Sequence, residues 1–449
     1  MSGWYETALR HVLFPLYEGG LRRRHTLDYF AAYERDQWLP PERIAALQFE
    51  RLKRLLEHCE REVPYYRRRW RELGIRAEDI RSLDDYARLP VLTKADIRAH
   101  FDELQAASWR GRLLFKATGG STGEPLRFGY TRESNDRRIA VMWRGYGWAG
   151  SRMGRRTLYL WGGAVGDPGR ARLLKDRLYN TLFARRMLDS FHMTEANLAE
   201  YAEAIERYRP EVIVAYVGPL VRLAQWILAT GRRTWRPQVI LGAAEALHGF
   251  QREIIEQAFG CPASNTYGCR EFMLIAAECE RRHGLHVNAD HLVVELAGKP
   301  APGQPGDVVA TDLFNYGMPL LRYANGDIAT AATHACSCGR GLPLLERIDG
   351  RKLDAIRSPA GHVLPGEFFP HMLKDVPGLA RFQLVQHRLD RLDLAIVRGA
   401  GFDDASLAYI RREVAKVLGD AVQLDVRFVD DIALTPSGKL RVTVSELAG

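Results

Sequence analysis

Short apolar runs alternate with amphipathic segments through the middle of the chain. We expect the apolar runs to be buried strands, at residues 157–161, 212–216 and 239–241. Helical periodicity marks the segments 198–208, 220–230 and 250–259. Pro210, Gly231 and Gly260 follow these helices and end them. Because strands and helices alternate, the pattern predicts a parallel α/β sheet, in which ligands bind beyond the carboxyl ends of the strands.

The pattern changes on either side of this region. Leucine and isoleucine recur at helical spacing from about Pro40 to Gly74, which predicts one helix there. From Asp307 onward the apolar runs are short and predict β segments, at 308–311 and 320–323. Strand, helix and strand signals then follow at 383–397, 407–418 and 424–429.

These patterns predict an α/β protein with two domains. We expect a large N-terminal domain over residues 1–349, with parallel-rich sheets flanked by helices and a β-rich subdomain. A small α+β domain is expected over residues 350–449. A chain of 449 residues is long enough for each domain to have its own core.

The composition of the chain bears on its expected location and partners. No apolar run approaches the roughly 20 residues of a membrane helix, and no secretory signal opens the chain, so a cytoplasmic location without membrane contact is expected. The formal net charge is +9, much of it from arginine clusters. A basic surface is compatible with a nucleic-acid-binding protein. No known nucleic-acid-binding motif accompanies the charge, which favours solvated helix faces and no nucleic-acid partner.

The most informative local motif is the glycine-rich segment from Thr118 to Pro125. Its first six residues contain three glycines and three hydroxyl side chains. Glycine allows close approach of the backbone to a ligand, and successive N–H groups with Ser and Thr hydroxyls can hold phosphate oxygens. It differs from the common P-loop, because no Lys-Ser/Thr pair follows its last glycine. The alternative interpretation is a flexible surface turn.

Four more motifs follow in order, at Thr266–Glu271, Arg322–Asp327, Asp349–Asp354 and Thr435–Arg441. With the glycine-rich segment, this ordered set resembles the adenylate-forming enzymes: acyl-CoA synthetases, peptide-synthetase adenylation domains and luciferases. Within them it is most similar to the phenylacetate–CoA ligase branch and its capsule-biosynthesis-type relatives. The runs at 63–67 and 89–94 also resemble that branch, so the resemblance covers nearly the whole chain.

The resemblance implies an AMP-forming acid–thiol ligase that uses ATP, Mg²⁺ and CoA. Such an enzyme activates a carboxylic acid, by family default an aromatic one, to an acyl-adenylate with release of pyrophosphate. The C-terminal domain then rotates, and CoA takes the acyl group as a thioester. An amine or a carrier-protein thiol stays open as an alternative acceptor, and a homodimer also stays open.

The resemblance also implies the ATP-binding residues. The phosphates would lie against Thr118, Gly119, Gly120, Ser121, Thr122 and Gly123. The adenine would lie against Gly242, Ala243, Ala244 and Glu245 and against Thr266, Tyr267 and Gly268. Tyr267 would stack on the purine, although core packing is an equally ordinary role for a tyrosine.

The remaining assigned residues carry charge. Glu271 is the implied Mg²⁺ ligand, since a hard cation prefers carboxylate oxygen; the alternative is a surface acid paired with Arg270. Asp327 would accept hydrogen bonds from the ribose hydroxyls, unless it is only a turn residue. Arg351 would contact the ribose or a phosphate at the hinge. Lys439, within Pro-Ser-Gly-Lys, is the implied catalytic lysine that bridges the carboxylate and the α-phosphate. Leu353 departs from the charged hinge residue of most relatives, which leaves the pivot position open.

Soft metal ligands suggest a structural zinc site at Cys279, His286, Cys336 and Cys338. Some members of the branch that the chain resembles carry such a zinc. His283 and His334 compete as ligands, and four reduced, unconnected side chains are the alternative. The other three cysteines, Cys59, Cys261 and Cys269, are expected to be thiols.

Aromatic residues are frequent in the region that would hold the acid. Five of them are candidates for the wall of an aromatic-lined pocket: Tyr130, Trp143, Tyr146, Trp161 and Tyr216. Ordinary core packing is the competing interpretation for all five.

Overall fold

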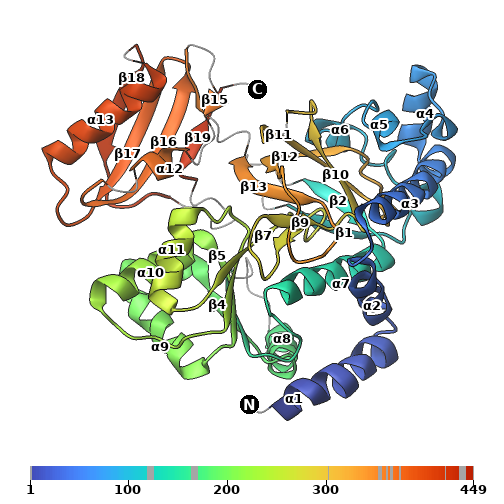
Figure 1. The fold of residues 1–449 in the computed structure, drawn as a ribbon, viewed down its shortest axis with the longest axis horizontal. Helices are drawn as coiled ribbons and strands as arrows, with labels where there is room; N and C mark the ends of the chain where they lie inside the picture. The colour runs from blue at the N-terminus through green and yellow to red at the C-terminus, as the bar shows by residue number, and fades with distance from the viewer. Residues whose placement is uncertain are drawn as a thin grey trace. The chain divides into compact units, whose positions relative to one another are not determined.

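The computed structural model describes residues 3–118, 126–162, 170–301, 303–351, 356–359, 363–364, 368–373, 376–419, 421–433 and 441–447 (Figure 1). Its contacts divide the chain into two compact units. The first unit comprises residues 1–325 and 330–347, and the second comprises residues 326–329 and 348–449. The division by contacts near Ile348 lies close to the expected domain boundary, while the mobility of the second domain stays a prediction.

An 11-stranded sheet, most of whose residues belong to the first unit, has the order β10-β11-β12-β13-β9-β8-β7-β6-β5-β3-β4. Its parallel half consists of β3 (Thr157–Trp161), β4 (Arg185–Asp189), β5 (Val212–Tyr216), β6 (Val239–Ala243) and β7 (Ala263–Tyr267). The other half consists of β8 (Ala276–Glu278), β9 (Leu285–Val287), β10 (Leu292–Ala297), β11 (Pro305–Asp312), β12 (Tyr323–Ala331) and β13 (Leu344–Arg351). A separate antiparallel pair is formed by β1 (Leu114–Ala117) and β2 (Arg127–Tyr130).

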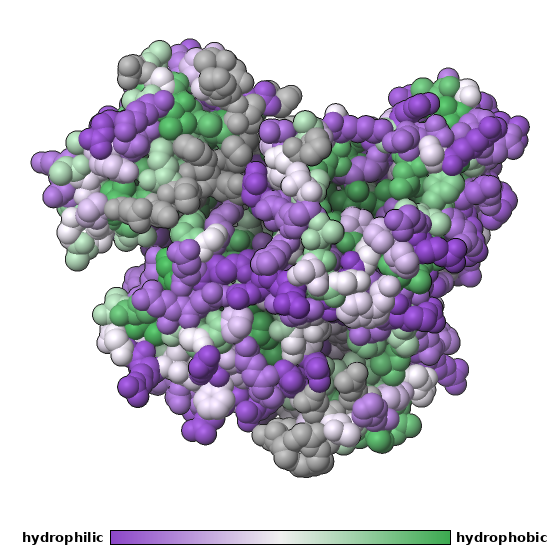
Figure 2. All heavy atoms as spheres, in the orientation of Figure 1, coloured by the Kyte–Doolittle hydropathy of each residue, from purple (hydrophilic) through white to green (hydrophobic). Residues whose placement is uncertain are grey.

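Helices cover both faces of the parallel half because its strands are apolar on both sides. One face, with Leu158, Ile213 and Ile240, packs against α9 (Leu198–Tyr208), α10 (Val217–Thr230) and α11 (Gly249–Phe259). The opposite face packs against Tyr146 of α7 (Arg132–Trp148). Hydrophilic side chains are spread over the outer sides of α9 to α11 in the face shown in Figure 2, as amphipathic helices require. This arrangement confirms the predicted α/β fold class.

The predicted helix from Pro40 to Gly74 is wrong in one respect. The structure has two helices there, α3 (Pro41–Glu62) and α4 (Pro64–Leu73). Pro64 has no N–H to continue α3, and it begins α4 instead. Gly74, with a φ of +66°, ends α4 in the left-handed conformation that glycine favours.

The other α-helices of the first unit are α1 (Gly3–Ala8), α2 (Thr26–Asp36), α5 (Leu83–Tyr86), α6 (Lys94–Ala99) and α8 (Arg170–Leu182). The predicted β segment at 320–323 is also wrong for its first three residues. Only Tyr323 belongs to a strand, because Arg322 takes a positive φ of 50°. None of the described helices combines the length and the apolar character needed to cross a membrane.

The second unit has a four-stranded sheet of order β18-β17-β16-β19, with bounds β16 (Leu379–Arg388), β17 (Arg391–Arg398), β18 (Gln423–Phe428) and β19 (Thr443–Ser445). Helix α13 (Asp404–Leu418) packs on it through Ile410, Val414 and Leu418. The single signal predicted at 383–397 is a hairpin, which turns at Leu389 and Asp390. The other elements of the second unit are α12 (Phe368–Leu373), β14 (Ile356–Arg357) and β15 (Val363–Leu364).

Candidate functional site

Four parallel strands end at one edge of the sheet in the first unit. Strands β3, β5, β6 and β7 end there with Trp161, Tyr216, Ala243 and Tyr267. Tyr216 pairs with Ala243, and Gly242 pairs with Asn265, which sets the strand ends side by side. Most of the described residues expected to bind the adenine therefore lie at the edge where open α/β sheets bind ligands.

The loop after β6 is held by two polar contacts. The Thr266 hydroxyl donates to the Gly242 carbonyl oxygen at 2.8 Å. The Gly218 N–H donates to the Glu245 carboxylate at 2.6 Å, at the start of α10. Ala244 takes a left-handed φ of +67°, which costs free energy for a residue with a side chain. The contacts of Glu245 show a carboxylate that shapes this loop from the N-terminus of a helix.

Close packing determines the backbone after β7. A Cβ atom on Gly268 would lie 1.8 Å from the Met273 carbonyl oxygen, so only glycine fits at this position. The preceding Tyr267 is buried, and its phenol oxygen accepts a hydrogen bond from the Asn325 amide at 2.8 Å. This contact connects the TYGCRE motif to the first residues of β12.

Glu271 is buried, with 4% of its surface exposed. The Tyr323 hydroxyl donates to its Oε1 at 3.0 Å. The alternative of a surface acid paired with Arg270 does not hold, because Arg270 donates instead to the Ala117 carbonyl oxygen at 2.9 Å. A buried carboxylate held by one hydroxyl retains oxygen lone pairs for a hard cation.

Thr118 closes the two ends of the glycine-rich segment. Its N–H donates to the Leu126 carbonyl oxygen at 2.9 Å, and its Oγ1 accepts from the Leu126 N–H at 2.9 Å. The sequence-predicted phosphate ligands Gly119, Gly120, Ser121, Thr122 and Gly123 lie outside the described residues.

Lys116 is a candidate that the motif analysis did not assign. Its Nζ lies 4.6 Å from the centre of the Tyr130 ring, and the Arg138 guanidinium lies 5.6 Å from the same ring. Burial, and then the charges of Arg138 and Arg270, lower the pKa of Lys116 to about 8. Several cations beside a loop that is expected to hold phosphates would point to Lys116 as a phosphate ligand. The sequence does not show this cluster, because Arg138 and Arg270 are distant from Lys116 along the chain.

Two more of the predicted residues meet in the second unit. The Arg351 Nε lies 3.5 Å from Asp327 Oδ1, so the residues expected to bind ribose form an ion pair with each other. Lys439 and Leu353 lie outside the described residues. Their roles stay predictions.

The five candidate aromatic residues do not form one pocket. Trp161 and Tyr216 lie at the carboxyl ends of their strands with ring centres 4.4 Å apart, and Phe191 lies 6.2 Å from Tyr216. Tyr130 contacts Lys116, while Trp143 and Tyr146 line a separate pocket on α7. Only the Trp161–Tyr216 pair lies at the edge expected for the acid.

The four predicted zinc ligands come together in the structure. Their ligand atoms all lie within 4.8 Å of one another. The Cys279 and Cys336 sulfurs are 3.6 Å apart, and the Cys338 sulfur is 3.2 Å from His286 Nε2. Tetrahedral zinc with sulfur ligands requires about 3.8 Å between sulfurs, from Zn–S bonds of about 2.3 Å. The geometry fits a closed structural site, while the presence of zinc stays a prediction.

Hydrogen bonding and burial give His286 the orientation and the neutral charge that a metal ligand needs. The Leu342 carbonyl oxygen lies 3.3 Å from its Nδ1, which leaves Nε2 toward the sulfurs. Burial lowers the pKa of His286 to about 4, so the ring is neutral at pH 7. The competing histidines contact each other instead, since His334 Nε2 lies 3.3 Å from the His283 carbonyl oxygen.

Comparisons with known proteins find relatives in the same family that the order of motifs resembles. The family model described as the CapK C-terminal domain matches residues 356–446. Phenylacetate-coenzyme A ligase of Thermus thermophilus is 30% identical over 403 residues, which is 86% of this chain and 86% of that protein. Protein CapK of Staphylococcus aureus is 23% identical over 438 residues, 95% of this chain and 94% of that protein.

Solved structures share the fold. The crystal structure of 2-hydroxyisobutyryl-CoA ligase in the postadenylation state superposes with a TM-score of 0.73 at 21% sequence identity. The match covers 92% of each chain. At this identity the likeness establishes a common fold, and the substrate has to be inferred from the site of this chain.

Proposed function

Because this chain belongs to the phenylacetate–CoA ligase branch of the adenylate-forming enzymes and is an AMP-forming acid–CoA ligase, we propose that it converts an aromatic acid to its CoA thioester. The carboxylate attacks the α-phosphorus of ATP, and pyrophosphate leaves. The CoA thiol then attacks the acyl carbon, loses its proton and displaces AMP. The observation that supports the aromatic acid best is the Trp161–Tyr216 pair at the carboxyl ends of β3 and β5.

The adenine-side residues of this proposal come from the edge of the parallel sheet. Tyr267 presents a buried ring whose hydroxyl is already engaged with Asn325. The loop from Gly242 to Glu245 is anchored at both ends by the contacts with Thr266 and Gly218. A loop that is held in place before ATP arrives loses little conformational entropy on binding, which favours affinity.

A carboxylic-acid panel tests this function. We expect pyrophosphate release with ATP and Mg²⁺ to be fastest for aryl acids such as phenylacetate and benzoate and slow for short aliphatic acids. Addition of CoA should yield the thioester with AMP in equal amounts. Fastest turnover with an aliphatic acid would contradict the aromatic substrate. Product formed with amines but not with CoA would contradict the acceptor.

Replacement of Glu271 by glutamine is expected to raise the Mg²⁺ concentration for half-maximal turnover at least about tenfold, because the amide retains size but loses the charge that a hard cation needs. A Mg²⁺ titration of pyrophosphate release measures this. Tyr323→Phe is the matched control, since it removes the hydrogen bond to Glu271 and leaves the carboxylate charge. An unchanged Mg²⁺ titration in Glu271→Gln would exclude this residue as the ligand.

The depressed pKa of Lys116 predicts a pH dependence of ATP binding. Lys116 is charged below about pH 8 and loses its charge above it. If the charged form contacts phosphate, one ionisation at this pKa raises the KM for ATP about eightfold between pH 7.5 and 9. Lys116→Arg stays charged in this range and should show a nearly flat profile. Equal profiles in both proteins would exclude Lys116 from phosphate binding.

A further inference from the structure

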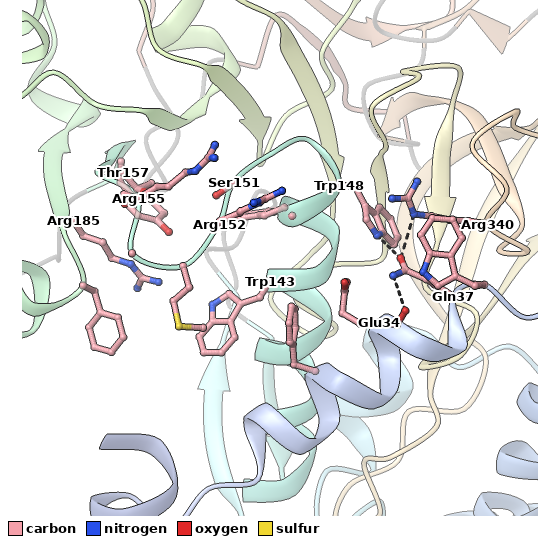
Figure 3. A pocket seen from close by; sticks show the side chains of 18 residues that line it. Glu34, Gln37, Trp143, Trp148, Ser151, Arg152, Arg155, Thr157, Arg185 and Arg340 are labelled. Carbon is pink, nitrogen blue, oxygen red and sulfur yellow. Dashed lines mark hydrogen bonds between the residues drawn. The ribbon is translucent and has the colours of Figure 1, made fainter. Parts of the chain in front are cut away.

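A second pocket lies in the first unit and takes no part in the proposed adenylation. Its volume is about 350 Å³, within the lower range of small-molecule sites. It is lined by side chains of α2 and α7, by the loop 151–155, by the first residues of β3 and β4, and by Arg340 (Figure 3). All of these residues belong to the described part of the chain.

The pocket lies at the opposite end of the strands from the candidate active site. Thr157 and Arg185, which line it, are the first residues of β3 and β4 and pair with each other. Trp161 ends β3 at the other edge. Trp161 comes four residues after Thr157 along the strand, which corresponds to about 13 Å. A ligand in this pocket would therefore not occupy the adenylation centre.

One side of the pocket is basic. It is formed by Arg152, Arg155 and Arg185, while Glu34 is the one acid among the lining residues. Arg155 donates to the Gly150 carbonyl oxygen at 2.9 Å. Arg185 packs over the rings of Phe183 and Tyr159, at 5.3 and 5.6 Å. Within the described residues, neither Arg152 nor Arg185 forms an ion pair, so two guanidinium groups remain to bind an anion.

The other side is aromatic and rigid. In the view of Figure 3, Trp143 lies below Arg152, with Arg185 to its left and the group formed by Gln37, Trp148 and Arg340 to its right. The Trp148 Nε1 donates to Gln37 Oε1 at 2.6 Å, and Arg340 donates to the same oxygen at 3.2 Å. The Trp143 ring makes a T-shaped contact with the Phe14 ring, with ring centres 4.8 Å apart. Fixed indole rings offer stacking surface for a flat ligand.

We propose that this pocket is a second ligand site, which binds a flat aromatic anion separately from the adenylation centre. The arginine forks match a carboxylate or a phosphate, and Trp143 provides the surface for the ring. An aryl carboxylate and a purine nucleotide share this chemistry. The site would let an acid or a nucleotide bind to the protein without competing for the catalytic edge of the sheet.

Two neighbouring arginines on β4 provide a test position and its matched control for ligand binding in this pocket. Arg185 and Arg186 follow each other on β4, so their side chains leave opposite faces; Arg186 lies over the Tyr208 ring at 5.8 Å and does not line the pocket. The full chain is titrated calorimetrically with AMP and, separately, with benzoate. We expect Arg185→Ala to weaken one binding event at least tenfold and Arg186→Ala to leave it unchanged. If the Arg185-dependent binding is seen with AMP, the anion is a nucleotide phosphate. If it is seen with benzoate, the anion is an aryl carboxylate.

A second variant covers the case in which Arg185→Ala disturbs the fold. Arg152 is exposed on the loop before β3, so Arg152→Ala should fold normally and weaken the same event severalfold. ATP–pyrophosphate exchange should stay within twofold of the unmodified protein in both variants. The proposal is overturned if no binding event with either probe depends on Arg185 and Arg152. It is also overturned if exchange falls in parallel with binding.

Discussion

Replacement of Lys439 by alanine is expected to slow acyl-adenylate formation by about a hundredfold to a thousandfold. The lysine is expected to lie between the carboxylate and the α-phosphate, where negative charge develops as the bond forms. A preorganised cation at such a position contributes several kcal/mol of transition-state stabilisation. ATP–pyrophosphate exchange with the best acid of the panel measures the loss.

The second half-reaction separates a catalytic role from a general defect. Thioester formation from supplied acyl-adenylate and CoA should decrease much less, because the adenylate is already made. Lys416→Ala is the matched control in the same unit, since Lys416 is exposed on α13 and pairs with Glu413 at 2.8 Å. Equal loss in both half-reactions, or equal loss in the control, would refute the assignment of Lys439.

Removal of Cys336 and Cys338 together is expected to release one zinc ion per chain and to lower Tm by about 5 °C or more. The two thiols come from the loop between β12 and β13, and the other two ligands come from β9 and the end of β8. A bound metal therefore joins segments that are fifty or more residues apart in the sequence. Elemental analysis of protein purified without chelator and a thermal unfolding curve measure both effects.

The neighbouring histidines decide whether the ligand set is correct. His286→Ala should release the metal, because the His286 Nε2 lies 3.2 Å from the Cys338 sulfur. His334→Ala should retain it, because the ring of His334 contacts the His283 carbonyl oxygen outside the cluster. Less than one equivalent of zinc in the unmodified protein, unchanged by zinc in the medium, would leave the four residues without a metal role. Selective loss of adenylation chemistry in the double variant would argue against a structural site.

Two expectations about partners stay predictions. We expect no nucleic-acid partner, and binding of labelled RNA and DNA at physiological salt tests this, because non-specific affinity falls steeply with salt. A homodimer is the second of these expectations. Sedimentation of the purified chain measures its oligomeric state directly.

Local patterns determined much of the fold. Helix α9 and strand β5 begin and end at the predicted residues, because Pro210 stops the helix and the apolar run from Val212 to Tyr216 forms the strand. The order of short motifs was enough to identify the family. The prediction of one helix over 40–74 was wrong because hydrophobic periodicity continues across Val63 and Pro64, where the backbone hydrogen bonding does not.

Long-range contacts determined what the sequence left open. Periodicity did not distinguish Trp161, at the edge of the candidate site, from Trp143, in the second pocket, since that depends on which end of the sheet each residue lies near. The choice of His286 over His283 and His334 required the pairing of β8 with β9, which sets His286 opposite Ala277. The two cations around Lys116, Arg138 and Arg270, come from two other segments of the chain. A sequence by itself determines its local periodicities and the order of its motifs, whereas packing between distant segments decides which side chains meet.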